Sequence, residues 1–412
     1  MAASDRERMM RRAWVVMGAA VLALTAGAAE AQSPRAARRI HEKLIALDTH
    51  LDTPASFSMP GWDIMDRHRQ ADDGTQVDYP RMVEGGLDGG FFAVFTSAQP
   101  VTPAGDRAAR DMAIIRATEI HEMVAKHGER FALATEADDA ARIAAEGKRI
   151  VYISMENSQP VEADLSLMKT FYDLGVRMMG PAHFKTNDLA DSATDAAKWN
   201  GLSDKGRAFV AEANRLGIIL DASHSSDAVF DQMLALSTTP IVLSHSGVKG
   251  VHDHPRNLDD ARLKALAAKG GVIQILAFSA YMVDQPKIPE RDAALGALFR
   301  EAGSPRRMTP ERRKAFQVRR AAIEAQYPVP QASFETFMAH LEHAIKVAGI
   351  DHVGVGLDMD GGGGVAGLED VSMNWKITER LLNDGYSPAD CAKVWSGNVL
   401  RVMRAVEAAK AK

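Results

Sequence analysis

The chain contains almost no cysteine: Cys391 is the only one among its 412 residues. An intrachain disulfide is therefore excluded, and a fold of this length must depend on a large hydrophobic core. Positive charge is not in excess either, because the formal net charge is −5 at pH 7. This mild acidity argues against a nucleic-acid partner, which would require a basic face.

Long apolar runs are also missing, apart from one near the amino terminus. Residues 13–29 are apolar, follow four arginines and end at the small-residue pattern Ala29-Glu30-Ala31. This order is typical of a secretory signal. We predict a signal peptide over residues 1–31 and a periplasmic location, with a retained membrane anchor as the alternative. No later run is long enough to cross a membrane, so we expect residues 32–412 to form one soluble domain without stable membrane insertion.

Eight short runs, rich in apolar and β-branched residues, alternate with helix-like stretches along the chain. Strands that are apolar on both faces predict an α/β fold with a parallel (β/α)8 barrel of the TIM type, and a doubly wound sheet is the second choice. No Gly-rich dinucleotide or phosphate-binding fingerprint follows the first run, which weakens the second choice. The runs are 44–52, 89–97, 149–157, 176–184, 217–225, 239–247, 270–278 and 352–361.

One segment departs from this rhythm. Residues 281–333 are charged, rich in Arg, Glu and Pro, and mostly helical in pattern. The segment separates the seventh run from the eighth. We predict a helical insertion that forms a lid or rim at the carboxyl-end face of the barrel, and a solvated helical excursion without function is the alternative.

Ionisable side chains occur late in six of the eight runs. In a parallel barrel the carboxyl ends of the strands meet at one mouth, which is where barrel enzymes carry their chemistry. We therefore expect these side chains to converge on one site. Imidazole and carboxylate groups without thiolate suit zinc and its chemical neighbours. The residues are His50, Asp52, Glu156, His183, His224, His245 and Asp358.

The number of candidate ligands predicts a pair of metal ions. Five residues are too many for one catalytic zinc, which takes three protein ligands, but they are enough for two ions if one carboxylate bridges. Two ions about 3.5–4 Å apart would convert a bridging water to hydroxide and polarise a carbonyl, so we predict a hydrolase. Asp358 could take the proton of that water and pass it to a leaving amine. The five are His50, Asp52, Glu156, His224 and His245.

Seven sequence motifs together resemble one known family over residues 40–405. The chain is similar to the membrane (renal) dipeptidases, the M19 metallopeptidases of the amidohydrolase superfamily. The resemblance implies a zinc-dependent dipeptidase that hydrolyses free dipeptides, and it suggests a homodimer. The motifs are DTHLD, SMEN, AHFKTNDLADS, LDASHSSD, PIVLSHSGVKGVHDHPRN, HVGVGLDMDG and VWSGNVLR.

The resemblance also implies a role for each candidate residue. His50 and Asp52 match ligands of the more buried zinc, Glu156 matches the bridging carboxylate, and His224 and His245 match ligands of the second zinc. His183 resembles the histidine that contacts the substrate and polarises the scissile carbonyl. Arg256 matches the arginine that binds the substrate carboxylate, and Asp358 matches the acid-base aspartate.

Several residues have competing interpretations. Lys185 follows the fourth run, where other amidohydrolases use a carboxylated lysine as the metal bridge, but Glu156 already fills that role. We expect supporting or solvated roles for His252 and His254. Asp48 and Asp221 precede the histidines of their runs and either orient them or cap turns.

The residues from Asn157 to Gln159 depart from the family, which more often has glycines and a histidine there; this leaves substrate specificity open. Two other classes of protein remain open as well. One is a different metal hydrolase on the same barrel, such as a lactonase or a deaminase. The other is a periplasmic protein that binds ligands through its metal; the presence of Asp358 argues against it, because a binding protein needs no proton shuttle.

Overall fold

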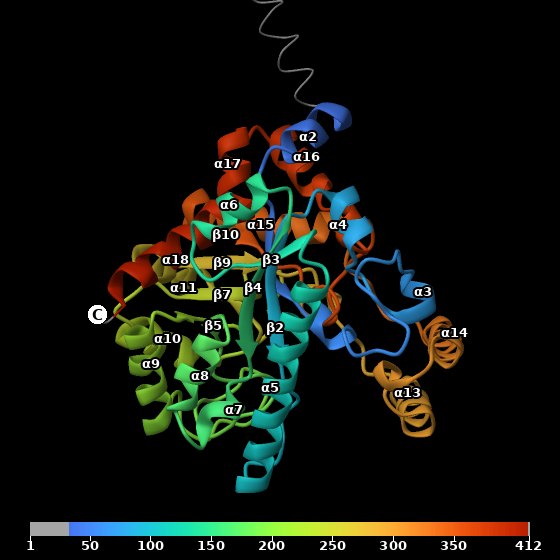
Figure 1. Ribbon diagram of the computed structural model, residues 1–412, viewed down its shortest axis with the longest axis horizontal. Helices are drawn as coiled ribbons and strands as arrows, with labels where there is room; N and C mark the ends of the chain where they lie inside the picture. The colour runs from blue at the N-terminus through green and yellow to red at the C-terminus, as the bar shows by residue number, and fades with distance from the viewer. Residues whose placement is uncertain (1–32, 411–412) are drawn as a thin grey trace, which may run out of the picture.

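The computed structural model describes residues 33–410 of the chain, so the predicted signal peptide lies outside the described residues. Parallel strands alternate with helices (Figure 1). All eight predicted runs contribute a strand. The barrel strands are β1 Leu47–Leu51, β2 Gly89–Phe95, β4 Arg149–Glu156, β5 Val176–Met179, β6 Ile219–Leu220, β7 Val242–Val248, β9 Val272–Ile275 and β10 Val353–Val355.

The strands close into a ring through two isolated bridges. One sheet has the order β1-β2-β4-β5-β6, and the other has the order β10-β9-β7. The parallel bridge between Asp221 and Val242 joins the end of β6 to β7. The parallel bridge between Leu51 and Met359 joins β1 to the segment after β10. The predicted (β/α)8 TIM-type barrel is therefore confirmed. Two short strands lie outside the ring: β3 (Phe131–Leu133) pairs with β4, and β8 (Asn257–Leu258) pairs with β7.

Helices follow the strands and several begin at a side-chain cap. Thr102, Ser203 and Ser226 each accept a hydrogen bond from the backbone N–H three residues on, which satisfies a donor at the helix start. The helices between the strands are α5 Pro103–Lys126, α6 Asp139–Ala145, α7 Gln159–Glu162, α8 Leu167–Asp173, α9 Asp204–Leu216, α10 Asp227–Leu236, α11 Asp260–Ala268 and α15 Phe334–Ala348. Two further helices, α3 Gln70–Asp73 and α4 Tyr79–Gly85, lie between β1 and β2. Helix α2 Pro34–His41 precedes β1, and β10 is followed by α16 Trp375–Asn383, α17 Pro388–Ala392 and α18 Asn398–Ala409.

The inside of the barrel is filled at its amino end. A buried cluster joins early residues of seven strands, such as Leu47, Ile219 and Val272, to α18. This arrangement closes the amino end with side chains, so the mouth lies at the carboxyl ends of the strands, as in other barrels of this type. Within residues 33–410, no helix combines the length and apolar character needed to cross a membrane.

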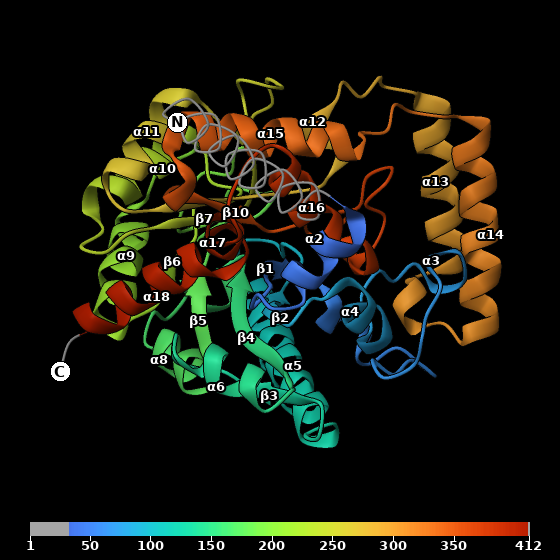
Figure 2. The same cartoon turned by 90° about the horizontal axis from the view of Figure 1, so that it is seen from above.

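The predicted insertion folds as helices between β9 and β10. The segment contains α12 (Ser279–Met282), α13 (Pro289–Ala302), the short 3₁₀ turn η2 (Pro305–Arg307) and α14 (Pro310–Gln326). Figure 2 shows α13 and α14 side by side at the right edge of the molecule, with α3 next to α14. Arg313 donates to the carbonyl of Pro60 at 2.8 Å, so the hairpin is attached to the segment that follows β1. Its role as a lid stays a prediction.

Candidate metal centre

The seven ionisable residues predicted to converge do so at the carboxyl ends of the strands. All are buried, with exposed fractions between 1% and 8%. His50 and His245 lie within β1 and β7, and Glu156 is the last residue of β4. The others lie just past their strand ends rather than in them. Three overlapping groups could each hold a metal ion: His50–Glu156–His245, Glu156–His183–His224 and His50–Asp52–Asp358.

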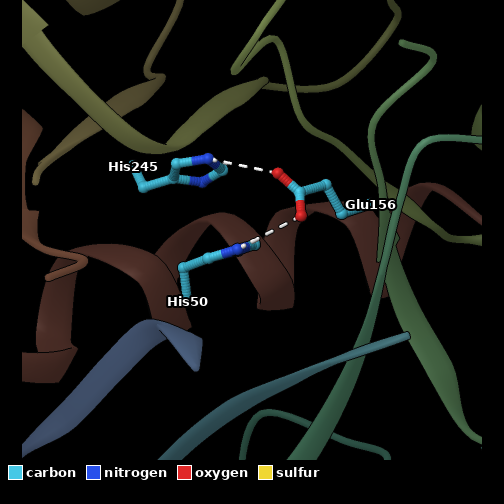
Figure 3. A group of neighbouring side chains, drawn as sticks. All are labelled: His50, Glu156 and His245. Carbon is cyan, nitrogen blue, oxygen red and sulfur yellow. Dashed lines mark ion pairs between the residues drawn. The ribbon is translucent and has the colours of Figure 1, made fainter. Parts of the chain in front are cut away.

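Glu156 lies at the centre of the cluster, with its two oxygens facing different partners. Its Oε2 is 3.5 Å from Nε2 of His50. Its Oε1 is 2.9 Å from Nε2 of His224 and 3.3 Å from Nε2 of His245. Figure 3 shows the carboxylate beside the stacked rings of His50 and His245, with one oxygen directed toward each ring. A carboxylate in this position can bind one cation through each oxygen.

A second pair of carboxylates extends the cluster beyond His50. The Nε2 atom of His50 lies 3.6 Å from Oδ2 of Asp52 and 3.9 Å from Oδ1 of Asp358. Three buried carboxylates around one imidazole repel one another unless a positive charge separates them. In accord with this crowding, burial and the charges of Asp52 and Glu156 raise the pKa of Asp358 well above its usual value, against the opposing charge of His50.

The donor set fits metal ions. Nε2 of His50, Oδ1 of Asp52 and Nδ1 of His224 are buried and have no hydrogen-bond partner among the described residues. Burial lowers the pKa of His224 well below its usual value and lowers the pKa of His245 to about 3, so both rings are neutral at pH 7. Neutral imidazole is the form that binds a metal. Burial opposes ionisation of Glu156, but neighbouring histidines hold its pKa well below the usual range.

Three residues at the mouth have a left-handed backbone, which is uncommon outside glycine. The φ angles are 66° at Asn157, 65° at His224 and 63° at Asp358. Each residue comes just after a barrel strand, where the chain turns sharply away from the sheet. Non-glycine residues are held in this region at an energetic cost, and such positions cluster at functional sites.

Two aspartates support the cluster from behind, in different ways. Asp48 accepts hydrogen bonds from the backbone N–H groups of His50 and Leu357, so it joins β1 to the segment after β10 rather than contacting the His50 ring. Asp221 accepts a hydrogen bond from Ser244 Oγ, which in turn lies 2.8 Å from Nδ1 of His245. Asp221 therefore orients the His245 ring through a serine.

Arg256 is buried beside the cluster. Its guanidinium donates to the carbonyl of His245 at 3.1 Å and to Oγ of Ser246 at 3.3 Å. The guanidinium carbon lies 5.2 Å from the centre of the Tyr281 ring. Tyr281 is the first residue of the predicted insertion, and the sequence patterns gave no reason to place it in the site. It is 7% exposed and forms one wall beside Arg256.

Aromatic side chains surround His183. Its ring contacts Phe95, at 4.9 Å between centres, and Phe184, at 3.9 Å. Nε2 of His183 lies 3.5 Å from Oε1 of Glu156. Burial lowers the pKa of His183, so the ring is neutral at pH 7 and can donate one hydrogen bond toward the cluster.

The residues with competing interpretations lie outside the cluster. Lys185 is exposed and pairs with Asp195 at 3.3 Å, so it does not provide a metal bridge. His254 accepts a hydrogen bond from the backbone N–H of Arg256, and this contact is a supporting one. Gln159 exchanges hydrogen bonds with the backbone of Gln99, which leaves its amide engaged in the fold rather than facing the cluster.

A parallel barrel with buried histidines and carboxylates at its mouth is the arrangement of a metal-dependent enzyme. The sequence profile of the membrane dipeptidase family (peptidase family M19) matches residues 34–412, and the chain belongs to this family. As a member it is a metallo-dipeptidase. The family resemblance predicted from the sequence motifs is thus confirmed.

Individual relatives agree with this assignment. Dipeptidase tcpJ of Claviceps purpurea (strain 20.1) is 30% identical over 80% of this chain and 69% of its own length. The crystal structure of the probable dipeptidase PvdM from Pseudomonas aeruginosa is 31% identical, with a TM-score of 0.77 over 91% of this chain and 98% of that one. A metallopeptidase from Rhodobacter sphaeroides, solved with a phosphinate mimic of L-Ala-D-Ala, shares the fold at 23% identity and a TM-score of 0.67, over 88% of this chain and 99% of that one.

Proposed function

We propose that the protein is an exported dipeptidase that hydrolyses free dipeptides with two zinc ions bridged by Glu156. The observation that carries this proposal is the position of Glu156, whose two oxygens face separate sets of metal-ligand side chains. His50 and Asp52 would hold one ion with Oε2 of Glu156. His224 and His245, which both lie near Oε1 of Glu156, would hold the other. When bound, the two ions supply an acidified water and a Lewis acid for the scissile carbonyl.

Asp358 is the proposed proton carrier. A carboxylate is able to take a proton from a water and pass it to a leaving amine. The carboxylate lies beside His50 and Asp52, within reach of a water held at the cluster. Asp358 would receive the proton of that water and deliver it to the leaving amine. The neutral His183 ring would donate a hydrogen bond to the carbonyl oxygen as negative charge develops there.

Arg256 is the proposed determinant of dipeptide length. A cation at a fixed distance from the cluster can pair with the free carboxylate one residue beyond the scissile bond. Guanidinium suits this role because it binds carboxylate through two parallel hydrogen bonds. Burial of Arg256 and its hydrogen bond to His245 fix that distance. A longer peptide would place an uncharged amide where the carboxylate belongs.

Turnover of a matched substrate panel tests the proposal. With zinc present, we expect hydrolysis of a free dipeptide, little hydrolysis of the same dipeptide amidated at its carboxyl end, and none of the tripeptide. Equal rates on the dipeptide and its amide would refute the role of Arg256 and favour a broader metal hydrolase.

For export, the mass of protein recovered from a periplasmic extract should correspond to a chain that begins at or near Gln32.

A further inference from the structure

The helical hairpin formed by α13, η2 and α14, together with the two residues that precede α13, has a charge opposite to that of the whole chain. Residues 287–326 contain ten Lys and Arg but only five Asp and Glu, whereas the whole chain has a net charge of −5. An excess of five positive charges in one element creates a local positive potential that attracts anions. Whether this potential acts on a substrate at the barrel mouth depends on where the cations lie in the hairpin.

Three cations that are unpaired within the described residues lie at the η2 end of the hairpin, and two others, Lys287 and Arg291, lie at its opposite end. Arg306, Arg307 and Arg312 are exposed, and none forms an ion pair with any residue among 33–410. Farther along α14, Lys314, Arg319 and Arg320 are instead paired with carboxylates, at 2.7–3.1 Å. Free guanidinium groups are therefore concentrated where α13 turns into α14.

The η2 turn lies at the rim of the barrel mouth. Arg116 on α5 donates to the carbonyl of Pro54, two residues after Asp52. Burial lowers the pKa of Arg116, and the positive charge of Arg306 lowers it further, whereas the charges of Glu119 and Asp52 raise it. Arg306 is therefore near enough to Arg116 for the two charges to interact. A cavity of about 340 Å³ separates the hairpin from the segment after β1. It is lined by Ser56, Thr75 and Asp360 on the barrel side and by Pro305, Arg306 and Phe316 on the hairpin side.

Two carboxylates border this cavity, and neither forms an ion pair with Arg306. Asp360 accepts hydrogen bonds from Oγ1 of Thr53 and the backbone N–H of Gln76. Asp73, which also lines the cavity, pairs with Nδ1 of His68 at 2.7 Å. Arg306 therefore remains available for a carboxylate from outside the protein.

The barrel places this rim across the mouth from Arg256. Around the ring the strands follow the order β1, β2, β4, β5, β6, β7, β9, β10, so that β2 and β7 are opposite each other. Arg256 follows β7, and α5 with Arg116 follows β2. A dipeptide whose carboxylate pairs with Arg256 and whose peptide bond lies at Glu156 would direct its amino-terminal residue toward β1 and β2. The η2 turn lies on that side.

We propose that Arg306, with Arg307 beside it, favours dipeptides whose amino-terminal residue has an acidic side chain. This inference rests on the proposed dipeptidase function. An exposed ion pair contributes little, so it gives a preference and not an absolute requirement. We expect the preference to be about fivefold in kcat/KM, and to weaken as salt screens the charges.

The test compares two substrates that differ only in charge: Glu-Ala and Gln-Ala. The zinc-loaded enzyme should cleave Glu-Ala with about fivefold higher kcat/KM at low salt, and the ratio should approach one at about 0.5 M NaCl. Arg306→Glu should abolish or invert the ratio while leaving kcat/KM for Gln-Ala unchanged. Lys287→Glu is the matched control, because it makes the same charge change at an exposed position at the other end of the hairpin. It should keep the ratio.

Three outcomes would overturn the inference, and they can be told apart. Equal kcat/KM for the two dipeptides in the unmodified enzyme, or a ratio that survives in Arg306→Glu, would refute the role of the η2 turn and leave the proposed dipeptidase intact. An equal loss of the ratio in Lys287→Glu would refute the local role and point to net charge alone. Failure to cleave either dipeptide, with both metal ions bound, would overturn the proposed function together with this inference.

Discussion

Oγ of Ser244 lies 2.8 Å from Nδ1 of His245, on the opposite side of the imidazole from Glu156. The same hydroxyl donates to Asp221, so the serine fixes the orientation of a proposed metal ligand without touching the metal. Loss of such a support typically costs about 10–100-fold in metal affinity. We therefore expect Ser244→Ala to bind zinc about tenfold more weakly, as measured by competition with a chelator.

Ser246→Ala is a control for this prediction. Ser246 is also a buried serine next to His245, but it contacts Arg256 and not the imidazole. The substitution should leave zinc affinity unchanged. Equal zinc affinity in Ser244→Ala and the unmodified protein would show that the ring orientation does not depend on this hydroxyl.

Gly361 packs against both carboxylates at the open side of the cluster. A Cβ atom at this position would overlap Oδ2 of Asp52 and Oδ1 of Asp358. Gly361→Ala should therefore displace one or both carboxylates and reduce kcat by at least tenfold, since small displacements at a reacting centre have large effects. Thermal unfolding, measured in parallel, should change far less than turnover.

Gly128→Ala provides the matched control, because a Cβ there meets only ordinary contacts. That variant should retain full activity. Unchanged turnover in Gly361→Ala would indicate that the two carboxylates move apart freely and that their close approach is not needed for the reaction.

Arg256 gives a prediction about substrate discrimination. Loss of a partly desolvated charged contact costs about 2–5 kcal/mol, so Arg256→Ala should lower kcat/KM for a free dipeptide by well over tenfold. The variant should keep its metal ions, and it should cleave the amidated dipeptide no worse than the unmodified enzyme does. Arg256→Lys should not restore the rate, because a single ammonium cannot match the two-pronged contact. An equal loss on both substrates would instead indicate a structural role.

Glu162 gives a prediction about pH and stability. Burial, together with the adjacent Asp106, raises the pKa of Glu162 from 4.5 to about 8 in the folded protein. The unfolded chain loses this proton near pH 4.5 while the folded protein keeps it, so the free energy of unfolding falls as the pH rises from about 4.5 to about 8. Glu162→Gln removes the penalty and can still accept the 2.8 Å hydrogen bond from Asp188 N–H.

We therefore expect Glu162→Gln to unfold at a temperature at least about 2 °C higher than the unmodified protein at pH 8. The difference should disappear near pH 4, where Glu162 is protonated in both states. Glu122→Gln, at an exposed position, should show no such dependence on pH. A difference in unfolding temperature that stays the same from pH 4 to pH 8 would contradict the account.

The sequence could predict the barrel and the convergence of its ionisable residues because both follow from local patterns. Apolar runs identify the strands, and the parallel arrangement brings their carboxyl ends together. The strand lengths were harder to predict. Only Ile219 and Leu220 form β6, since the chain after Asp221 turns away through the left-handed residue His224. An apolar run does not reveal where such a turn begins.

Contacts between distant segments could not be predicted in this way. Tyr281 lies against Arg256 only because the segment after β9 folds back beside the loop after β7. Gln159 lies in the stretch after Glu156 where the sequence departs from the family pattern. Its side chain accepts a hydrogen bond from the backbone N–H of Gln99, sixty positions away. Neither pairing leaves a periodic signal in the sequence, because each depends on how two loops meet in space.

The metal content of the purified protein tests the central claim most directly. Protein kept free of chelator should contain close to two zinc ions per chain, because Glu156 faces two sets of ligands. Glu156→Gln should lose metal and turnover together, whereas Lys185→Ala should retain both. Two ions per chain, with loss of metal in Glu156→Gln, is the result that the account predicts. One ion per chain in a fully active enzyme would contradict it.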